Sequence, residues 1–162
     1  MAAWDVAYAR LQTYLNECSL HARRLQMARE KVAPLLPMDK GAYEGLDAEA
    51  IEHINWLFYR VIKLQDPMGH KLFPQILIVA DDDEMWASKP IIDVLNRLEK
   101  YRYLPDAWEW RELRHVRNMI AHEYETLPEK AVEAIQAVFD KSAYLIDLFS
   151  KMEKKIRNEV RL

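Results

Sequence analysis

An arginine, a histidine and a tyrosine lie close together in the segment RNMIAHEY, residues 117 to 124. Arg117 supplies a permanent, forked positive charge of the kind that binds a phosphate group. His122 titrates near neutral pH, so its ring can take up or release a proton. Asn118 precedes His122 by about one helical turn and can hydrogen-bond the ring or a substrate. These residue types match the needs of RNA cleavage, which activates a 2′-hydroxyl, protonates a leaving oxygen and stabilises charge on the phosphate.

The same residues also have structural explanations. On a helix, Arg117 falls close to an apolar stripe that includes Leu113 and Tyr124, whereas His122 points roughly 140° away from Arg117. The arginine then extends along the surface, meets a carboxylate inside the fold or borders a cleft. The second histidine of the zinc-protease signature is missing after His122, and no Cys/His cluster joins it to His115. A metal site is therefore not expected.

Four further polar residues are candidates for the same cleft. Arg60, Asp66 and Lys71 flank a predicted bend at Pro67–Gly69, and Arg114 belongs to the locally basic segment RELRHVRN. For the first three residues, a surface ion pair or a helix-end cap is the simpler explanation.

Two tryptophans and an acidic run each have two explanations. Trp108 and Trp110 can stack on RNA bases, but core or dimer-interface anchors are the preferred interpretation. The run DDDE, 81 to 84, lacks the spaced partners of a metal-binding loop and is expected to be a solvated turn.

Apolar spacing and capping signals predict that helices position these residues. The first helix spans about 3 to 33 and leads into the connector 33 to 45, which gathers prolines and glycines. Asp47 caps a second helix that ends or bends near Asp66-Pro67. Residues 71 to 80 suit a short buried strand or a helix, and a helix is preferred because no partner strand is found in the sequence.

The second half of the chain carries further start signals. Ser88 caps a helix over about 89 to 102, and Asp106 with Glu109 resembles a capping box at the start of the motif helix. Pro128 opens a last long helix that reaches about residue 159. The residues expected to face inward in the two middle helices are Ile51, Ile54, Leu57, Phe58, Val61, Leu64, Ile91, Ile92, Leu95 and Leu98.

Length and composition limit the number of domains, the fold class and the location of the protein. With 162 residues the chain is most simply one domain, 1–162, and an up-and-down antiparallel bundle of about five to six helices is expected. No uncharged run approaches the roughly 18 residues needed to cross a bilayer. The N-terminus lacks the pattern of a signal peptide, and the single cysteine, Cys18, fits a reducing compartment. A cytoplasmic location without membrane contact is therefore expected.

A wider resemblance extends the motif. The pattern R-N-x-x-x-H-x-Y resembles the Rx4HxY form of the motif in HepT toxins, which belong to the HEPN-domain family. The blocks FYRVIKLQDPMGHKLFP, 58 to 74, and VLNRLEKYRYLPDAWEWRELRHVRNMIAHEYE, 94 to 125, are similar as well. With the long flanking helices, the resemblance covers essentially the whole chain, and the combined blocks are more specific than the arginine–histidine spacing alone.

The resemblance implies a fold, an activity and a set of partners. It implies an all-α bundle that forms a homodimer and acts as a metal-independent endoribonuclease without a cofactor. The catalytic pair would be Arg117 and His122, assisted by Asn118, in the cleft where the motif helices of two protomers meet. A minimal nucleotidyltransferase antitoxin would inactivate this toxin by transferring AMP to Tyr124.

The opposed directions of Arg117 and His122 then have two explanations. Either the helix ends or unwinds near His122, or each cleft takes its arginine from one chain and its histidine from the other. AMP on Tyr124 would add an anion about two helical turns from Arg117. There it can pair with the guanidinium and occupy the space of an RNA phosphate.

A second function stands beside the first. The chain can instead be a non-catalytic adaptor or substrate-binding subunit of such a nucleotidyltransferase. A formal net charge of −3 favours the adaptor, because a ribonuclease gains association rate from a positive surface. The intact pair of Arg117 and His122, with the local excess of arginine at 111 to 118, favours the toxin.

Overall fold

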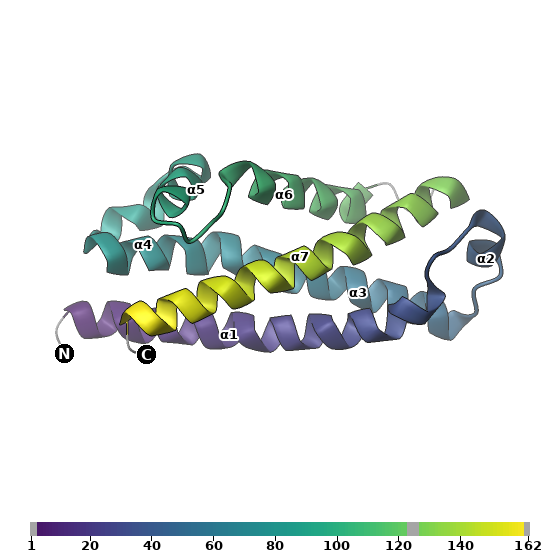
Figure 1. The fold of residues 1–162 in the computed structure, drawn as a ribbon, viewed down its shortest axis with the longest axis horizontal. Helices are drawn as coiled ribbons and strands as arrows, with labels where there is room; N and C mark the ends of the chain where they lie inside the picture. Colours follow the sequence, from purple (N-terminus) through teal and green to yellow (C-terminus); the bar gives the residue numbers. More distant parts are fainter. Residues whose placement is uncertain (1–2, 123–126, 161–162) are drawn as a thin grey trace.

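The computed structural model describes residues 3–122 and 127–160 as helices joined by short connections (Figure 1). The side chains of Ala121 and His122 lie outside the described part. These ranges contain no strand, so the predicted all-α bundle is confirmed, and so is the helical interpretation of residues 71 to 80. The α-helices are α1 (Ala3–Val32), α2 (Lys40–Glu44), α3 (Ala48–Pro67), α4 (Phe73–Asp81), α5 (Ile91–Lys100), α6 (Ala107–His122) and α7 (Pro128–Val160).

The helices are layered so that distant parts of the sequence meet. α1 packs along α3 and against α7, while α5 and α6 lie over α4 and the end of α3 (Figure 1). No helix in the described ranges is long and apolar enough to cross a membrane. The layering places the end of α3 beside α6, although about fifty residues separate the two segments in the chain.

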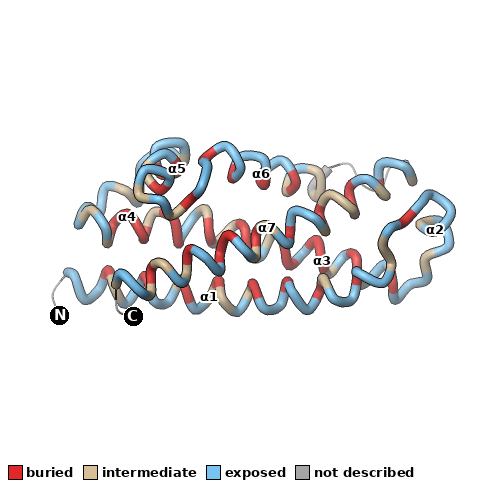
Figure 2. Tube along the Cα trace, in the orientation of Figure 1, coloured by how far each residue is buried: buried red, intermediate tan, exposed pale blue. Residues whose placement is uncertain are grey.

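α1 is a core helix because small and aliphatic residues recur along it every three or four positions. Their side chains face α3, α4 and α7, and buried positions follow the inner side of the helix in Figure 2. The buried residues of α1 are Ala7, Leu11, Leu15, Cys18, Ala22, Leu25, Ala28 and Val32.

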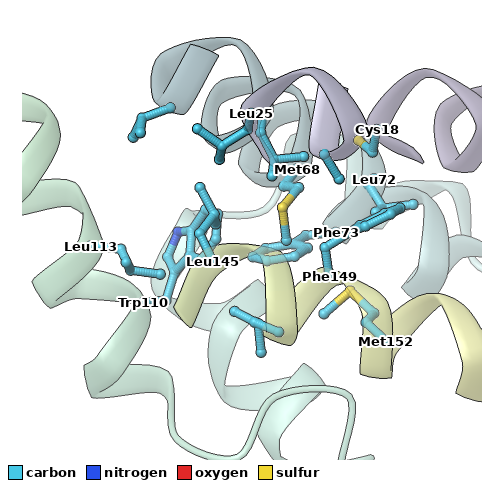
Figure 3. Packing of buried hydrophobic residues seen from close by; sticks show 14 of the residues in the cluster. Cys18, Leu25, Met68, Leu72, Phe73, Trp110, Leu113, Leu145, Phe149 and Met152 are labelled. Atoms are coloured by element: carbon cyan, nitrogen blue, oxygen red, sulfur yellow. The ribbon is translucent and has the colours of Figure 1, made fainter. Parts of the chain in front are cut away.

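Trp110 fixes α6 to the rest of the bundle. Its side chain is 2% exposed, and its ring centroid lies 4.5 Å from that of Phe73 (Figure 3). Gly69 permits this approach, because a Cβ at that position would lie only 3.2 Å from the indole ring. The preferred interpretation of Trp110 as a core anchor is confirmed, whereas Trp108 is 59% exposed and is not part of the core.

α3 passes into α4 through a π-helical turn, Met68–Leu72, rather than through a loop. Pro67 lacks an N–H and cannot complete the α-helical ladder, so the hydrogen bonding changes at this point. The wider turn closes with a bond from the Phe73 N–H to the Met68 carbonyl. Turns of this kind are frequent at functional sites. The predicted end near Asp66-Pro67 is confirmed in position, but the chain stays helical across it.

The helix-capping signals are correct at one helix and wrong at another. Asp47 caps α3 as predicted, with its carboxylate 2.8 Å from the Ala50 nitrogen. Ser88 does not cap α5: its hydroxyl donates to the Met85 carbonyl and closes a short 3-10 helix. Pro90 stands at the start of α5 instead, and no side chain caps that end.

The predicted capping box of α6 is wrong in its second half. Asp106 does accept a hydrogen bond from the N–H two residues later, at 2.8 Å. Glu109 does not reach back to Asp106, because its carboxylate accepts the hydroxyl of Tyr144 from α7. The N–H of Ala107 donates to Glu99 at 2.7 Å, so an acidic residue from α5 completes the cap.

Two other expectations are corrected by long-range packing. The acidic run 81 to 84 is not wholly a solvated turn, since Asp81 accepts hydrogen bonds from Trp86, Arg97 and Tyr101. Ile51 and Ile92 are not inward-facing, being 46% and 41% exposed. Each lies outside the stripe of buried positions, whose members in α5 are Val94, Leu95 and Leu98.

Candidate functional site

Arg117 lies on α6 and forms a two-pronged ion pair with Asp66, near the end of α3. Its Nε donates to Oδ1 at 2.9 Å and its Nη2 donates to Oδ2 at 3.1 Å. These hydrogen bonds, followed by the charge of the carboxylate, raise the pKa of Arg117. Of the explanations that the sequence offers for this arginine, pairing with a carboxylate and bordering a cleft are both observed.

A pocket of about 310 Å³ opens beside the ion pair. The side chains of Arg117 and Asp66 are 39% and 34% exposed, so solvent and ligands can reach the pair from the pocket. Its lining combines apolar side chains with polar and cationic ones. The residues that line the pocket are Gln65, Asp66, Gly69, His70, Ile91, Trp110, Arg114 and Arg117.

Gln65 is the unusual member of the pocket wall. Its side chain is 2% exposed, and among the described residues no hydrogen-bond partner reaches either its amide oxygen or its amide nitrogen. A buried polar group without a partner costs roughly 1–3 kcal/mol. A polar ligand that entered the pocket and drew this amide towards itself would remove that cost.

The cations of the pocket come from two elements that the fold brings together. Arg114 and Arg117 lie one turn apart on α6, and His70 is contributed by the π-helical turn. The packing of Trp110 on Gly69 holds these two elements against each other. Asp66 is the single acidic residue among those that line the pocket. The two arginines can therefore hold a phosphate ester through fixed positive charge, with the His70 ring beside them.

Two central residues of the motif fall at or beyond the edge of the described part. His122 is the last described residue of α6; its backbone is described, but its side chain is not. Tyr124 lies outside the described residues altogether. Asn118 is described and is exposed on α6. The described part of α6 stops at His122, so the prediction that the helix ends or unwinds near this residue concerns residues outside the described part.

Two of the other candidates do not line the Arg117 pocket. Lys71 forms an ion pair with Glu17 of α1, with nitrogen–oxygen distances of 3.2 and 3.3 Å, which fits the surface ion pair expected for it. Arg60 is neither a surface ion pair nor a helix-end cap, because it is only 5% exposed and lies in the middle of α3. Its Nη2 lies 2.7 Å from Nδ1 of His21.

Sequence reasoning missed Gln65, His70 and His21. A signal existed for Gln65 and for Arg60, since both occupy positions in the helical repeat of buried residues of α3, where an apolar side chain is the rule. No local signal marks His70 or His21, because their importance comes from neighbours on other helices. In the described ranges, no group of three or more His, Cys, Asp or Glu residues is placed to hold a metal ion.

Comparison of the chain with protein-family models, with curated proteins and with solved structures finds no match.

Proposed function

We propose that this chain is a metal-independent endoribonuclease of the HEPN type and acts as the toxin of a toxin–antitoxin pair. The observation that carries the proposal is the Arg117 guanidinium, fixed by Asp66 at a pocket that also presents Arg114 and His70. A phosphate is the ligand for which such a pair of forked arginine cations is best suited.

Asp66 acts in this proposal as a positioning residue. A guanidinium has five N–H donors, and Asp66 uses one from Nε and one from Nη2. The donors that remain point away from the carboxylate and can bind the non-bridging oxygens of a phosphodiester. Arg117 therefore need not release Asp66 in order to stabilise charge that develops on the phosphate.

His122 supplies the proton transfers in the proposed mechanism. It would remove the proton of the 2′-hydroxyl or protonate the leaving 5′-oxygen, because an imidazole ring can both accept and donate a proton. On one straight helix it points roughly 140° from Arg117. We therefore propose a homodimer in which each cleft combines an arginine of one protomer with a histidine of the other, assisted by Asn118.

The partner of this toxin is proposed to be a minimal nucleotidyltransferase that attaches AMP to Tyr124. The modification adds a phosphodiester anion and a nucleobase seven residues beyond Arg117, or about two helical turns. An anion there competes with RNA for the cations at the pocket, which include Arg114 and Arg117. Modified protein should then cleave RNA far more slowly than unmodified protein.

The decisive experiment is cleavage of total cellular RNA by the purified protein in EDTA. His122→Ala is the test variant, and His115→Ala is its matched control, because His115 is an exposed histidine on the same helix. We expect cleavage by the wild type and the control and none by the test variant. Equal cleavage by all three proteins would point to a contaminating nuclease and overturn the assignment of His122.

A second candidate function is a non-catalytic adaptor of the nucleotidyltransferase. The formal net charge of −3 favours it, as does the fact that Arg117 already has a full carboxylate partner. If folded, unmodified and dimeric wild-type protein leaves RNA intact but binds the nucleotidyltransferase, the adaptor replaces the ribonuclease as the function.

A further inference from the structure

A second group of cations surrounds a buried arginine on the other side of α3. Arg60 is 5% exposed, and among the described residues no carboxylate forms an ion pair with it and its Nε has no partner. Its Nη2 donates to Nδ1 of His21, a neutral acceptor. Burial and then the nearby charge of Arg24 lower the pKa of Arg60. A buried guanidinium without a counter-ion is an unfavourable arrangement that an anion would relieve.

A pocket of about 340 Å³ lies next to Arg60: Arg60 does not line it, but its hydrogen-bond partner His21 does. His21 from α1 lines it on one side, and Tyr59 and Lys63 from α3 line it on the other. Tyr59 is 53% exposed, and two cations lie over its ring: the Arg60 guanidinium carbon is 5.4 Å from the ring centroid and the Lys63 nitrogen is 5.7 Å from it. The pocket thus offers an exposed aromatic face beside positive charge.

Both acidic residues at this pocket have cationic or histidine partners, and those of Glu17 line the same pocket. Glu17 is held by Lys71 at 3.2 Å and lies 3.8 Å from Nε2 of His21. Asp66 is held by Arg117. Among the described residues, Lys63 has no carboxylate within ion-pair distance. Two positive charges are therefore left without a carboxylate partner: Lys63, which lines the pocket, and Arg60, which donates to the lining residue His21.

This pocket and the Arg117 pocket are neighbours. Asp66 and His70 line both of them, so the π-helical turn forms the ridge between the two. Together the pockets give a path from Arg114 and Arg117 on α6, across the turn, to Lys63 on α3. A chain with a phosphate at every residue can follow a path of this kind, whereas a single small anion can fill only one pocket.

We propose that the pocket of His21, Tyr59 and Lys63 is a second RNA subsite, in which Lys63 and the charge of Arg60 hold a phosphate and Tyr59 stacks on a base. The choice of RNA as the occupant rests on the proposed function. The subsite itself rests on the buried Arg60, the exposed Tyr59 and the shared ridge. Stacking of a base on an aromatic side chain is sequence-tolerant, so the subsite adds affinity rather than base specificity.

The test uses binding of a short 2′-O-methyl oligoribonucleotide, which has no free 2′-hydroxyl and cannot be cleaved through one. Fluorescence anisotropy is measured for wild type, Lys63→Ala, Tyr59→Ala, Tyr59→Phe and Lys141→Ala. Lys141 is an exposed lysine that lines neither pocket and serves as the matched control. A second ligand, an abasic oligomer of the same length with the same phosphates, separates stacking from charge.

We expect Lys63→Ala to weaken both ligands and to lower the slope of log K against log salt by about 0.7, the value for one phosphate contact with a single strand. Tyr59→Ala should weaken the oligoribonucleotide about tenfold, while Tyr59→Phe retains the ring and the affinity. Tyr59→Ala should leave the abasic ligand unchanged. The control should match the wild type for both ligands.

Each contrary result identifies what has failed. Wild-type affinity in Lys63→Ala and Tyr59→Ala, with weaker binding by Arg117→Ala, would overturn the second subsite and leave the proposed function intact. Equal losses for both ligands in Tyr59→Ala would overturn the stacking role and with it the nucleic-acid occupant. Binding that depends on Lys63 and Tyr59 in a protein that cleaves no RNA would support the subsite and remove the nuclease.

Discussion

Two arginine–aspartate pairs in this protein have the same geometry and opposite surroundings. Arg97 donates Nε and Nη2 to the two oxygens of Asp81 at 3.1 Å each. Arg117 donates the same two groups to Asp66 at 2.9 and 3.1 Å. The contact between arginine and aspartate alone therefore says nothing about which pair is structural and which serves a ligand.

The surroundings do distinguish the pairs. The Asp81 side chain is 14% exposed, and its carboxylate also accepts the Tyr101 hydroxyl and the Trp86 indole N–H. Burial opposes its ionisation, but the hydrogen bonds from Arg97, Tyr101 and Trp86 outweigh burial and lower the pKa of Asp81. Asp66 is 34% exposed, opens onto a pocket, and among the described residues accepts side-chain hydrogen bonds from Arg117 alone. A saturated pair joins helices, whereas an accessible pair can present its arginine to a substrate.

The largest expected effect is on catalysis. Arg117→Ala should lower kcat for RNA cleavage by about 10²–10³-fold, because it removes a fixed donor to charge on the phosphate. Its free energy of unfolding should change by no more than about 1 kcal/mol, since the pair is partly exposed. Single-turnover cleavage and urea unfolding measure the two quantities. Arg97→Ala is the matched control and should show unchanged cleavage per folded molecule, and a loss of cleavage there equal to that in Arg117→Ala would contradict the comparison.

The second effect is on stability. Asp81→Ala removes the acceptor shared by Trp86, Arg97 and Tyr101 and should cost about 2 kcal/mol in the free energy of unfolding. Asp66→Ala should cost at most about 1 kcal/mol. Urea denaturation followed by circular dichroism compares the two variants with the wild type. The distinction between a saturated and an accessible pair fails if the two substitutions cost the same.

A smaller effect should separate positioning from binding at Asp66. Asp66→Asn keeps the shape of the side chain but removes a negative charge beside the proposed phosphate site. A charge pair at about 4 Å in water is worth roughly 1 kcal/mol, so the 2′-O-methyl oligoribonucleotide should bind roughly fivefold tighter. Cleavage should slow about tenfold at the same time, because the guanidinium loses its fixed orientation. Weaker binding by the variant would show that Asp66 does not oppose the ligand's charge.

Local signals in the sequence were sufficient for most of the helices. The Asp47 cap, the end of α3 at Pro67 and the repeat of small residues along α1 each depend on residues within one or two helical turns. Helix formation in those segments needs no information from the rest of the chain. The all-α bundle was therefore predictable from spacing and capping alone.

The errors arise where a distant residue decides between partners. Glu109 accepts a hydrogen bond from Tyr144 of α7 instead of completing a capping box. Asp81 is removed from solvent by Arg97 of α5 and by Tyr101, the residue that follows this helix. The site follows the same rule. Arg117 was identifiable as a candidate site residue from its motif, but its pairing with Asp66 spans 51 residues and depends on the packing of Trp110.

Arg60 differs from both of these arginines, because among the described residues no carboxylate forms an ion pair with it. The smallest expected effect is on the pH dependence of stability near this residue. Its acceptor is His21, whose pKa is lowered first by burial and then by the charge of Arg60, with further lowering by Lys63 and Arg24 and an opposing effect of Glu17. In the unfolded chain, His21 takes up a proton near pH 6.5, the usual pKa of a histidine, whereas in the folded protein it does so only at lower pH. This residue therefore destabilises the fold as the pH falls below about 6.5. His21→Gln offers Arg60 an amide oxygen that does not titrate, and it should flatten the decline of unfolding free energy below that pH. Urea titrations of both proteins across this range measure the difference, and parallel curves would show that His21 ionises as freely in the fold as in the unfolded chain.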